Sequence, residues 1–280
     1  MSRSRLLTLA AGITVAAFAL TGCAGGSGDA DASSDPDAGF VTPGKLTIAT
    51  GDIAYYPYVV DDDPASGEGF EAAVAYAIAD ELGFEHDDVE WVRTSFEAAI
   101  APGPKNFDFN IQQYTITDER KQAVDFSSPY YSASQAVVAI EGGPADGVDS
   151  IAGLKDLTIG AMAGSTSAQT LQEVVQPTTD PQLFGSNEDV VAALNAGQID
   201  AFVIDLPTAY LATALYIEDS FIVGELPAGG IPDEWGVVLP KGSPLTERVS
   251  AALDTLREDG TLDEITDEWL GAGQGVTLLQ

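Results

Sequence analysis

The chain is poor in the side chains that carry metal and redox chemistry. Its 280 residues contain one cysteine, Cys23, and one histidine, His86. A single thiol excludes an intramolecular disulfide and a cysteine-based metal cluster. His86 lies in "FEHDD", just past a predicted helix, where we expect it to be solvated, so no Ser-His-Asp set is available. The sequence therefore predicts no cofactor and no metal site.

Positive charge is also scarce, with 11 basic against 44 acidic side chains. Without Arg3 and Arg5, which belong to the N-terminal leader discussed next, the formal charge is −35. Such a surface argues against nucleic acid and anionic membrane surfaces as partners, and we ascribe most of the acidity to solubility. With nine cations left, any cation in an unfavourable place needs an explanation.

No apolar run is long enough to span a bilayer, which needs about 20 residues. The longest run, "LLTLAAGITVAAFAL", follows Arg3 and Arg5 and leads into "LTGC", which is typical of a secretory signal over residues 1–22. Leu20 to Cys23 resembles a bacterial lipobox, which implies cleavage before Cys23 and lipid attachment there. The alternative is an ordinary secreted protein with a stray cysteine.

Residues 23–44 are small, polar and acidic, and they cannot bury a core. We interpret them as a flexible tether that lifts a folded part off the membrane. Two or more acyl chains on Cys23 would hold the protein stably on the extracytoplasmic face of the cell membrane. The folded part then begins near Lys45, and about 235 residues are enough for two lobes.

Strand patterns alternate with helix patterns from residue 45 onward. Expected strands are 45–50, 89–94, 107–113, 134–140, 157–162, 199–205, 221–226 and 235–240. Expected helices are 69–84, 118–124, 150–156, 167–175, 187–197, 207–216, 244–259 and 262–270, with Asn187 as a cap and Gly83 and Gly197 as stops. This order predicts an α/β fold with parallel sheets, whose ligands sit at the carboxyl ends of the strands.

One of those strand ends leads to Arg120, at the start of a short predicted helix in "YTITDER". Thr117 is a good N-cap, and a capping box would place Glu or Gln where Arg120 stands. One explanation pairs Arg120 with Asp118, Glu119 or Asp125 on the surface, for at most about 1 kcal/mol. The other is a bound carboxylate, which a guanidinium grips in two parallel hydrogen bonds.

Three other strand ends carry further candidates. The loop "GDIAYYPY" brings Asp52 and three tyrosines, a composition found more often in packing than in sites. The turn "AGSTS" (163–167) opens a helix whose N-terminus suits an anion, although such caps are also ordinary structural features. Asp205 precedes a helix and is either its N-cap or the acid for an ammonium group. Together with Arg120, this set describes an α-amino acid.

The chain resembles the bacterial solute-binding proteins of ABC importers, in the polar amino-acid-binding family, over about residues 45–270. The resemblance is carried in order by "LTIATGDIAYYPY", "GFEAAVAYAIADELG", "YTITDERKQAVDFSSPYY", "LKDLTIGAMAGSTS", "ALNAGQIDAFVIDLPTA" and "LREDGTLDEITDEWL". It implies a periplasmic-binding-protein-like clamshell with crossings near 132–137 and 225–234. Lobe one would then be 45–134 with 230–280, and lobe two 135–229.

The resemblance also implies roles for nine residues. Arg120 matches the arginine that binds the ligand carboxylate, and Thr115 a contact to carboxylate and amino group. Asp205 matches the acid for the α-ammonium. The remaining matches are Gln113 through its backbone carbonyl, Ser165 and Thr166 at the carboxylate, Tyr55 and Phe96 around the ligand, and Asp52 near its side chain.

The chain departs from the family pattern in "NIQQYT", where Gln112, Gln113 and Tyr114 could narrow the pocket. Asp52 suggests a basic or an amide side chain on the ligand, and the sequence leaves these two open. The resemblance implies an amino acid as the ligand and an ABC permease with its ATPase as the protein partner. We expect the protein to be a monomer. Rival hypotheses are a dehydratase-like enzyme on the same scaffold, a receptor's sensing domain and a nutrient-sensing lipoprotein.

Overall fold

The computed structural model describes residues 39–229, 233–271 and 275–280, all within one compact unit that spans Asp37–Gln280. The predicted signal peptide 1–22, Cys23 and most of the 23–44 tether lie outside the described residues. Among the helices of the described part, none has the length and apolar character needed to cross a bilayer.

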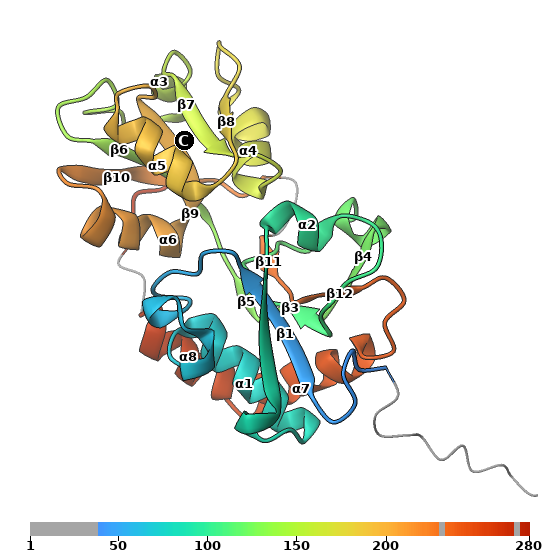
Figure 1. Cartoon of the computed structure of the whole chain (residues 1–280). Helices are drawn as coiled ribbons and strands as arrows, with labels where there is room; N and C mark the ends of the chain where they lie inside the picture. Colours follow the sequence, from blue (N-terminus) through green and yellow to red (C-terminus); the bar gives the residue numbers. More distant parts are fainter. Residues whose placement is uncertain (1–38, 230–232, 272–274) are drawn as a thin grey trace, which may run out of the picture. The chain divides into compact units, whose positions relative to one another are not determined.

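The first of two five-stranded sheets has the order β2-β1-β3-β12-β4 (Figure 1). Its strands are β1 (Leu46–Gly51), β2 (Val89–Thr94), β3 (Phe109–Asn110), β4 (Val124–Phe126) and β12 (Val238–Pro240). Apolar residues drive its formation: every residue of β1 is buried, as expected for a central strand covered on both faces.

Three helices cover one face of this sheet (Figure 1). They are α1 (Phe70–Leu82), α7 (Thr246–Glu258) and α8 (Thr261–Trp269), which share one core with β1 and β3. The predicted stop at Gly83 is confirmed, because this residue adopts φ +87° and closes α1. The short α2 (Phe96–Ile100) belongs to a second, smaller core with Phe107 and Tyr114.

Several connections of this half are single 3-10 turns: Val60–Asp62, Pro64–Ser66, His86–Asp88 and Arg120–Gln122. The predicted helix 118–124 is thus one tight turn. The residue that caps this turn is Glu119 and not the predicted Thr117, although the Thr117 Oγ1 accepts a hydrogen bond from the Arg120 N–H at 3.1 Å.

The second sheet has the order β10-β6-β9-β7-β8. Its strands are β6 (Gln135–Ile140), β7 (Ile159–Met162), β8 (Gln182–Phe184), β9 (Ala201–Asp205) and β10 (Ser220–Leu226). Along β6 the side chains alternate between two cores: Val137 and Ala139 face one, and Ala136 and Val138 face the other. Both faces are therefore covered.

The helices of this half are short, and two of them end in π-helical turns. They are α3 (Ile151–Leu154), α4 (Thr166–Thr170) with the π turn Leu171–Val175, α5 (Asn187–Asn195), and α6 (Leu206–Leu211) with the π turn Ala212–Tyr216. The predicted Asn187 cap is wrong. Ser186 is extended and its Oγ accepts from the Asp189 N–H at 3.1 Å, which frees the Asn187 amide for another contact.

The expectation of parallel sheets is only partly right, because each sheet contains one antiparallel strand. Strand β12 runs against both neighbours in the first sheet, and β6 does so in the second. Strand β12 directly follows β11 (Glu234–Trp235), and β6 directly follows β5 (Tyr131–Ser132). In both places the chain has just arrived from the other half. Without a helical crossover before it, a strand has no reason to enter in the parallel sense.

The two connecting segments run side by side, because β5 and β11 form a small antiparallel ladder of their own. The Ala133 N–H continues this ladder to the Asp233 carbonyl at 2.8 Å. These pairings place Asp233 next to the first residues of β6, within the region where the sequence expects the crossings.

The chain end departs from the expected lobe boundary. The sequence assigns residues 230–280 to the first lobe, yet residues 277–279 lie along β10 of the second sheet, with Leu279 N–H on the Glu225 carbonyl at 2.9 Å. The physical reason is an apolar fit: Leu279 is 1% exposed, and Gly224 has no side chain that would collide with it.

This packing predicts that Leu279→Ala will destabilise the protein by about 2–5 kcal/mol, the usual range for a buried leucine. Urea unfolding at fixed pH measures the change. Leu278→Ala is the matched control, because Leu278 is 49% exposed and should cost less than about 0.5 kcal/mol. Equal effects of the two changes would show that the tail does not contribute through Leu279.

Candidate functional site

A cavity of about 390 Å³ lies where loops from both sheets meet. Its walls come from the loop after β1, the segment after β3, the start of α4, the start of α5 and the end of β9. Eight of the nine residues singled out from the sequence line it: Asp52, Tyr55, Phe96, Gln113, Arg120, Ser165, Thr166 and Asp205. The residues singled out at the strand ends and through the family resemblance therefore lie around one cavity.

Arg120 is the buried cation of this cavity, with 8% exposure. Its Nη1 donates to the Thr115 carbonyl at 2.8 Å, and its Nη2 donates to the Gly164 carbonyl in the other half at 3.0 Å. The guanidinium carbon lies 5.3 Å from the centre of the Phe96 ring, within cation–π range.

The surface ion-pair explanation for Arg120 is wrong. Asp118 pairs with Lys121 and Asp125 with Lys241, and no ion pair joins Arg120 to a carboxylate of the described residues. Burial lowers the pKa of the Arg120 guanidinium, since desolvation disfavours the charged form. A buried cation held by carbonyl dipoles and an aromatic ring, without a carboxylate, is a strong attachment point for an anion.

The wall behind Arg120 is aromatic. Phe96 stacks on Tyr114 at 4.5 Å between ring centres, and the Tyr114 hydroxyl donates to the Phe96 carbonyl at 3.1 Å and to Gln112 Oε1 at 2.9 Å. Tyr114 is fully buried and does not line the cavity, so the expectation that it narrows the pocket is wrong. Gln112 and Gln113 do line it.

Thr115 lies behind the cavity wall and is 1% exposed. Its Oγ1 makes hydrogen bonds with Thr166 Oγ1 at 3.0 Å and with Asp233 Oδ1 at 2.7 Å, so it joins the two halves. It lines a neighbouring cavity of about 330 Å³ together with Gln135 and Asp233. Asp233 was missed from the sequence, where one of two adjacent acids in "GIPDEW" carries no signal.

Asp205 is not the side-chain cap of α6, since no hydrogen bond of that kind forms. Its carboxylate instead accepts from the amide of Gln135, which also donates to Asp233. Burial raises the pKa of Asp205 well above its ordinary value, the neighbouring Asp233 raises it further, and Arg120 opposes the shift. Two acids that share one amide donor favour a bound cation.

Ser165 and Thr166 use their hydroxyls within the protein. Ser165 caps α4, with its Oγ accepting from the Ala168 N–H at 3.1 Å and donating to the Met162 carbonyl at 2.7 Å. Thr166 is the partner of Thr115 described above. A ligand therefore contacts this turn either through the backbone N–H groups or, if these hydrogen bonds break, through the two hydroxyls.

Two tyrosines of the β1 loop reach across to the second half. The Asn187 amide donates to the Tyr55 hydroxyl at 3.3 Å, and the Tyr58 hydroxyl and Thr208 Oγ1 lie 2.8 Å apart. Tyr58 is 2% exposed, and burial raises its pKa well above the ordinary value. Both phenols are therefore neutral hydrogen-bonding groups, and they fix this loop against the second half.

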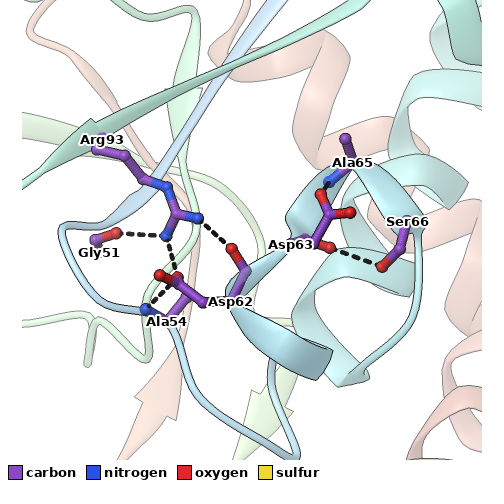
Figure 2. A network of polar contacts seen from close by, with 7 residues as sticks. All are labelled: Gly51, Ala54, Asp62, Asp63, Ala65, Ser66 and Arg93. Atoms are coloured by element: carbon purple, nitrogen blue, oxygen red, sulfur yellow. Dashed lines mark hydrogen bonds and ion pairs between the residues drawn. The ribbon is translucent and has the colours of Figure 1, made fainter.

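Arg93 braces the same loop through its guanidinium group (Figure 2). From the end of β2 its Nη1 donates to the Gly51 carbonyl at 2.9 Å and to Asp62 Oδ1 at 2.7 Å, and its Nη2 donates to the Asp62 carbonyl at 2.6 Å. Asp62 Oδ1 also accepts from the Ala54 N–H at 2.9 Å. These bonds hold both ends of the segment that carries Asp52 and Tyr55.

A buried acid of α1, Glu71, completes the cavity wall and was also missed from the sequence. It is 1% exposed, and burial raises its pKa to about 7. It accepts from the Gln113 N–H at 2.7 Å, and also from the Gln113 amide and the Tyr130 hydroxyl. Its place inside the apolar run "GFEAAVA" is a signal that could have identified it.

Comparison with known proteins identifies the family. The model of the bacterial extracellular solute-binding proteins, family 3, matches residues 46–272. The chain belongs to this family. The Glutamate-binding protein GluB of Corynebacterium efficiens (strain DSM 44549 / YS-314 / AJ 12310 / JCM 11189 / NBRC 100395) is 30% identical over 97% of this chain and 94% of its own length.

Two solved structures show the same fold. An ancestral arginine-binding protein bound to arginine is 33% identical, with a TM-score of 0.67 over 81% of this chain and 98% of that one. The ancestral amino acid-binding protein AncCDT-1, a precursor of cyclohexadienyl dehydratase, is 32% identical, with a TM-score of 0.66 over 81% and 95%. The α/β clamshell expected from the sequence is thereby confirmed.

Among the described residues, no group of three His, Cys, Asp or Glu side chains is placed to hold a metal ion. His86 is exposed and stacks on Tyr76 at 4.0 Å between ring centres. It is not part of the cavity lining.

The Arg93 brace predicts that Arg93→Ala will weaken solute binding about tenfold, because Asp52 and Tyr55 lose their fixed position at the cavity. Isothermal titration calorimetry measures the change. Lys45→Ala is the matched control, because its loss removes the same charge. Lys45 pairs with Asp88 just before β1 and β2 begin, at the ends of these strands that lie away from Gly51 and Arg93. A similar weakening in both variants would point to net charge instead of loop position.

Proposed function

We propose that this protein captures a polar amino acid and delivers it to the permease of an ABC importer. The observation that carries the proposal is the presence of Arg120 and Asp205 in one cavity, each from a different half of the molecule. Opposite charges on opposite walls match the carboxylate and the ammonium group of one zwitterion. The family and its relatives support this class of ligand.

In this proposal Arg120 binds the ligand carboxylate with help from the start of α4, and Asp205 binds the ammonium group. Tyr55 and Phe96 enclose the aliphatic part of the ligand. The backbone carbonyl of Gln113 accepts a further hydrogen bond from the ammonium group. Asp52 and Gln112 face the ligand side chain and favour a basic or an amide group.

Capture proceeds by closure of the two lobes on the ligand. Four hydrogen bonds already join the halves: Arg120 to Gly164, Thr115 to Thr166, Asn187 to Tyr55, and Tyr58 to Thr208. A ligand that contacts both walls adds to these bonds only when the lobes are closed. This differential contact shifts the equilibrium toward the closed form, which then docks on the permease.

Anchoring is part of the proposal. Cleavage of the leader 1–22 and lipid attachment at Cys23 would hold the protein on the extracytoplasmic face of the membrane, with the 23–44 segment as a tether. The support is the lipobox-like sequence and the extracellular character of the family. Mass spectrometry of the membrane-extracted protein tests it, and an unmodified Cys23 would contradict it.

A dehydratase-like activity is the rival on the same scaffold, and AncCDT-1 gives it an evolutionary link. We favour binding because the cavity pairs an acid and a cation for a zwitterion. The candidate proton donors, Glu71 and Asp205, are both bound to side-chain amides. Incubation with prephenate and with arogenate tests the rival, since turnover of either substrate would contradict the proposal.

The Arg120 assignment predicts that Arg120→Ala will abolish measurable binding while the protein stays folded. Losing a buried charge-assisted pair costs about 2–5 kcal/mol, equivalent to a factor of roughly 30 to several thousand in Kd. Calorimetry with a panel of the twenty amino acids measures it, beside circular dichroism for the fold. Lys121→Ala is the control, because this exposed neighbour pairs only with Asp118 and should bind normally.

The closure mechanism predicts a smaller radius of gyration with ligand than without it. Small-angle X-ray scattering on the mature chain, before and after addition of the amino acid that binds in the panel, measures the difference. Thr166→Val removes a cross-lobe hydrogen bond with little change of shape, and it should need more ligand for the same compaction. An unchanged radius at saturation would contradict lobe closure.

A further inference from the structure

Glu71 is a buried acid that the binding mechanism described above does not use. It lies in the first turn of α1 and lines the cavity, yet its two oxygens receive three donors from the protein itself. Two of these donors belong to Gln113, through its backbone N–H and its side-chain amide. The third is the hydroxyl of Tyr130, which is 4% exposed.

Gln113 has an unusual backbone conformation for its residue type, with φ +48°. A residue with a side chain pays of order 1–3 kcal/mol for such a conformation and keeps it only where the surroundings enforce it. The two hydrogen bonds from Gln113 to Glu71 hold this conformation most strongly, because hydrogen bonds to an ionised acid are stronger than those between neutral groups. Glu71 therefore determines the direction of the chain at Gln113.

The Gln113 carbonyl remains available as an acceptor. Its neighbours are engaged, because the Tyr114 carbonyl accepts from the Gly236 N–H and the Thr115 carbonyl accepts from Arg120. No donor of the described residues is recorded on the Gln113 carbonyl, although Gln113 lines the cavity. A strained residue with a free carbonyl at a binding cavity indicates a built acceptor site.

We propose that Glu71 is a positioning residue for the ligand's ammonium group: its carboxylate holds Gln113 in the left-handed conformation that presents the Gln113 carbonyl to that group. The proposal rests on the proposed function, because it assumes an amino acid in this cavity. It goes beyond that function by assigning a role to an acid that need not touch the ligand.

The protonation state of Glu71 gives the proposal a pH signature. The Tyr130 hydroxyl donates to this acid, and the acid also influences three further tyrosines through its charge: Tyr55, Tyr58 and Tyr114. Their pKa values are all raised above the ordinary value, so none of them titrates between pH 5 and pH 8. Protonation of Glu71 removes one acceptor from Gln113, and a bound ammonium group favours the ionised acid.

The sign of the pH effect follows from linkage. The pKa of Glu71 is raised to about 7, so the acid is protonated at pH 5.5 and ionised at pH 8 in the ligand-free protein. Binding that prefers the ionised form strengthens as pH rises through this range and weakens as pH falls. Asp205, whose pKa is also raised, acts in the same direction, so the effect of Glu71 must be isolated by substitution.

The experiment measures Kd by calorimetry at pH 5.5 and pH 8 for the wild type, Glu71→Gln and Asp108→Asn. The probes are L-arginine and L-glutamine, each beside its analogue without the α-amino group, 5-guanidinopentanoate or glutaramate. Asp108 is the matched control: it is 2% exposed and accepts two backbone N–H bonds, from Val41 and Thr47, outside the cavity lining. Thermal unfolding shows that each variant is folded.

We expect Glu71→Gln to weaken binding of the amino acid at pH 8 at least tenfold and the deamino analogue less than threefold. We also expect the Kd ratio between the two pH values to fall about tenfold relative to the wild type. Asp108→Asn should lower the unfolding temperature. It should keep the wild-type selectivity for the amino acid over its deamino analogue and the wild-type pH dependence of Kd. Unchanged selectivity and pH dependence in Glu71→Gln would overturn the proposal.

A second variant keeps the test decisive if Glu71→Gln folds poorly. Gln113→Gly accepts a positive φ without strain, so the loss on Glu71→Gln should be smaller in that background. If Glu71→Gln weakens binding by the same factor, within twofold, in the wild-type and the Gln113→Gly backgrounds, the positioning role is overturned. If the wild type binds none of the twenty amino acids, the proposed function itself fails, an outcome separate from failure of the Glu71 proposal.

Discussion

The buried guanidinium of Arg120 is the interaction on which the rest of the site depends. It is the one Lys or Arg among the described residues that is less than 9% exposed, and five of the other eight form ion pairs with aspartates. In a chain with four acids for every base, its lack of a described carboxylate partner is informative. Carbonyl dipoles and the Phe96 ring keep the cation in place without neutralising it.

The acids of the site are arranged around the same constraint. Asp205 and Asp233 meet at the amide of Gln135, and Glu71 meets the amide of Gln113, so each acid is held by a neutral donor. Pairing either acid with Arg120 would cancel both charges and leave nothing for a zwitterion. Neutral donors solve this problem, because they fix a carboxylate without consuming the cation.

The sequence predicted the cavity better than the bonds inside it. Apolar periodicity and strand ends located Arg120, Asp205 and Tyr55, since these signals depend only on local pattern. Asp233 was missed because its role comes from the pairing of β5 with β11, which no local pattern encodes. The antiparallel β6 and β12 and the docking of Leu279 were missed for the same reason: each is decided by contacts distant in sequence. The Ser186 cap is a local contact to the Asp189 N–H, and it was missed because the adjacent Asn187 is an equally good cap by residue type.

Several of the residues proposed to bind the ligand also join the lobes. Arg120 bonds to Gly164, and Thr115 to Thr166, so binding and closure share the same atoms. Burial lowers the pKa of Arg120 and raises the pKa of Asp205, because desolvation disfavours the charged form of each. A zwitterion supplies each of them with the opposite charge, and it therefore recovers free energy that closure alone cannot. In the proposed mechanism only the closed form brings both charges to one ligand, so the electrostatic cost of closure favours a molecule that carries both.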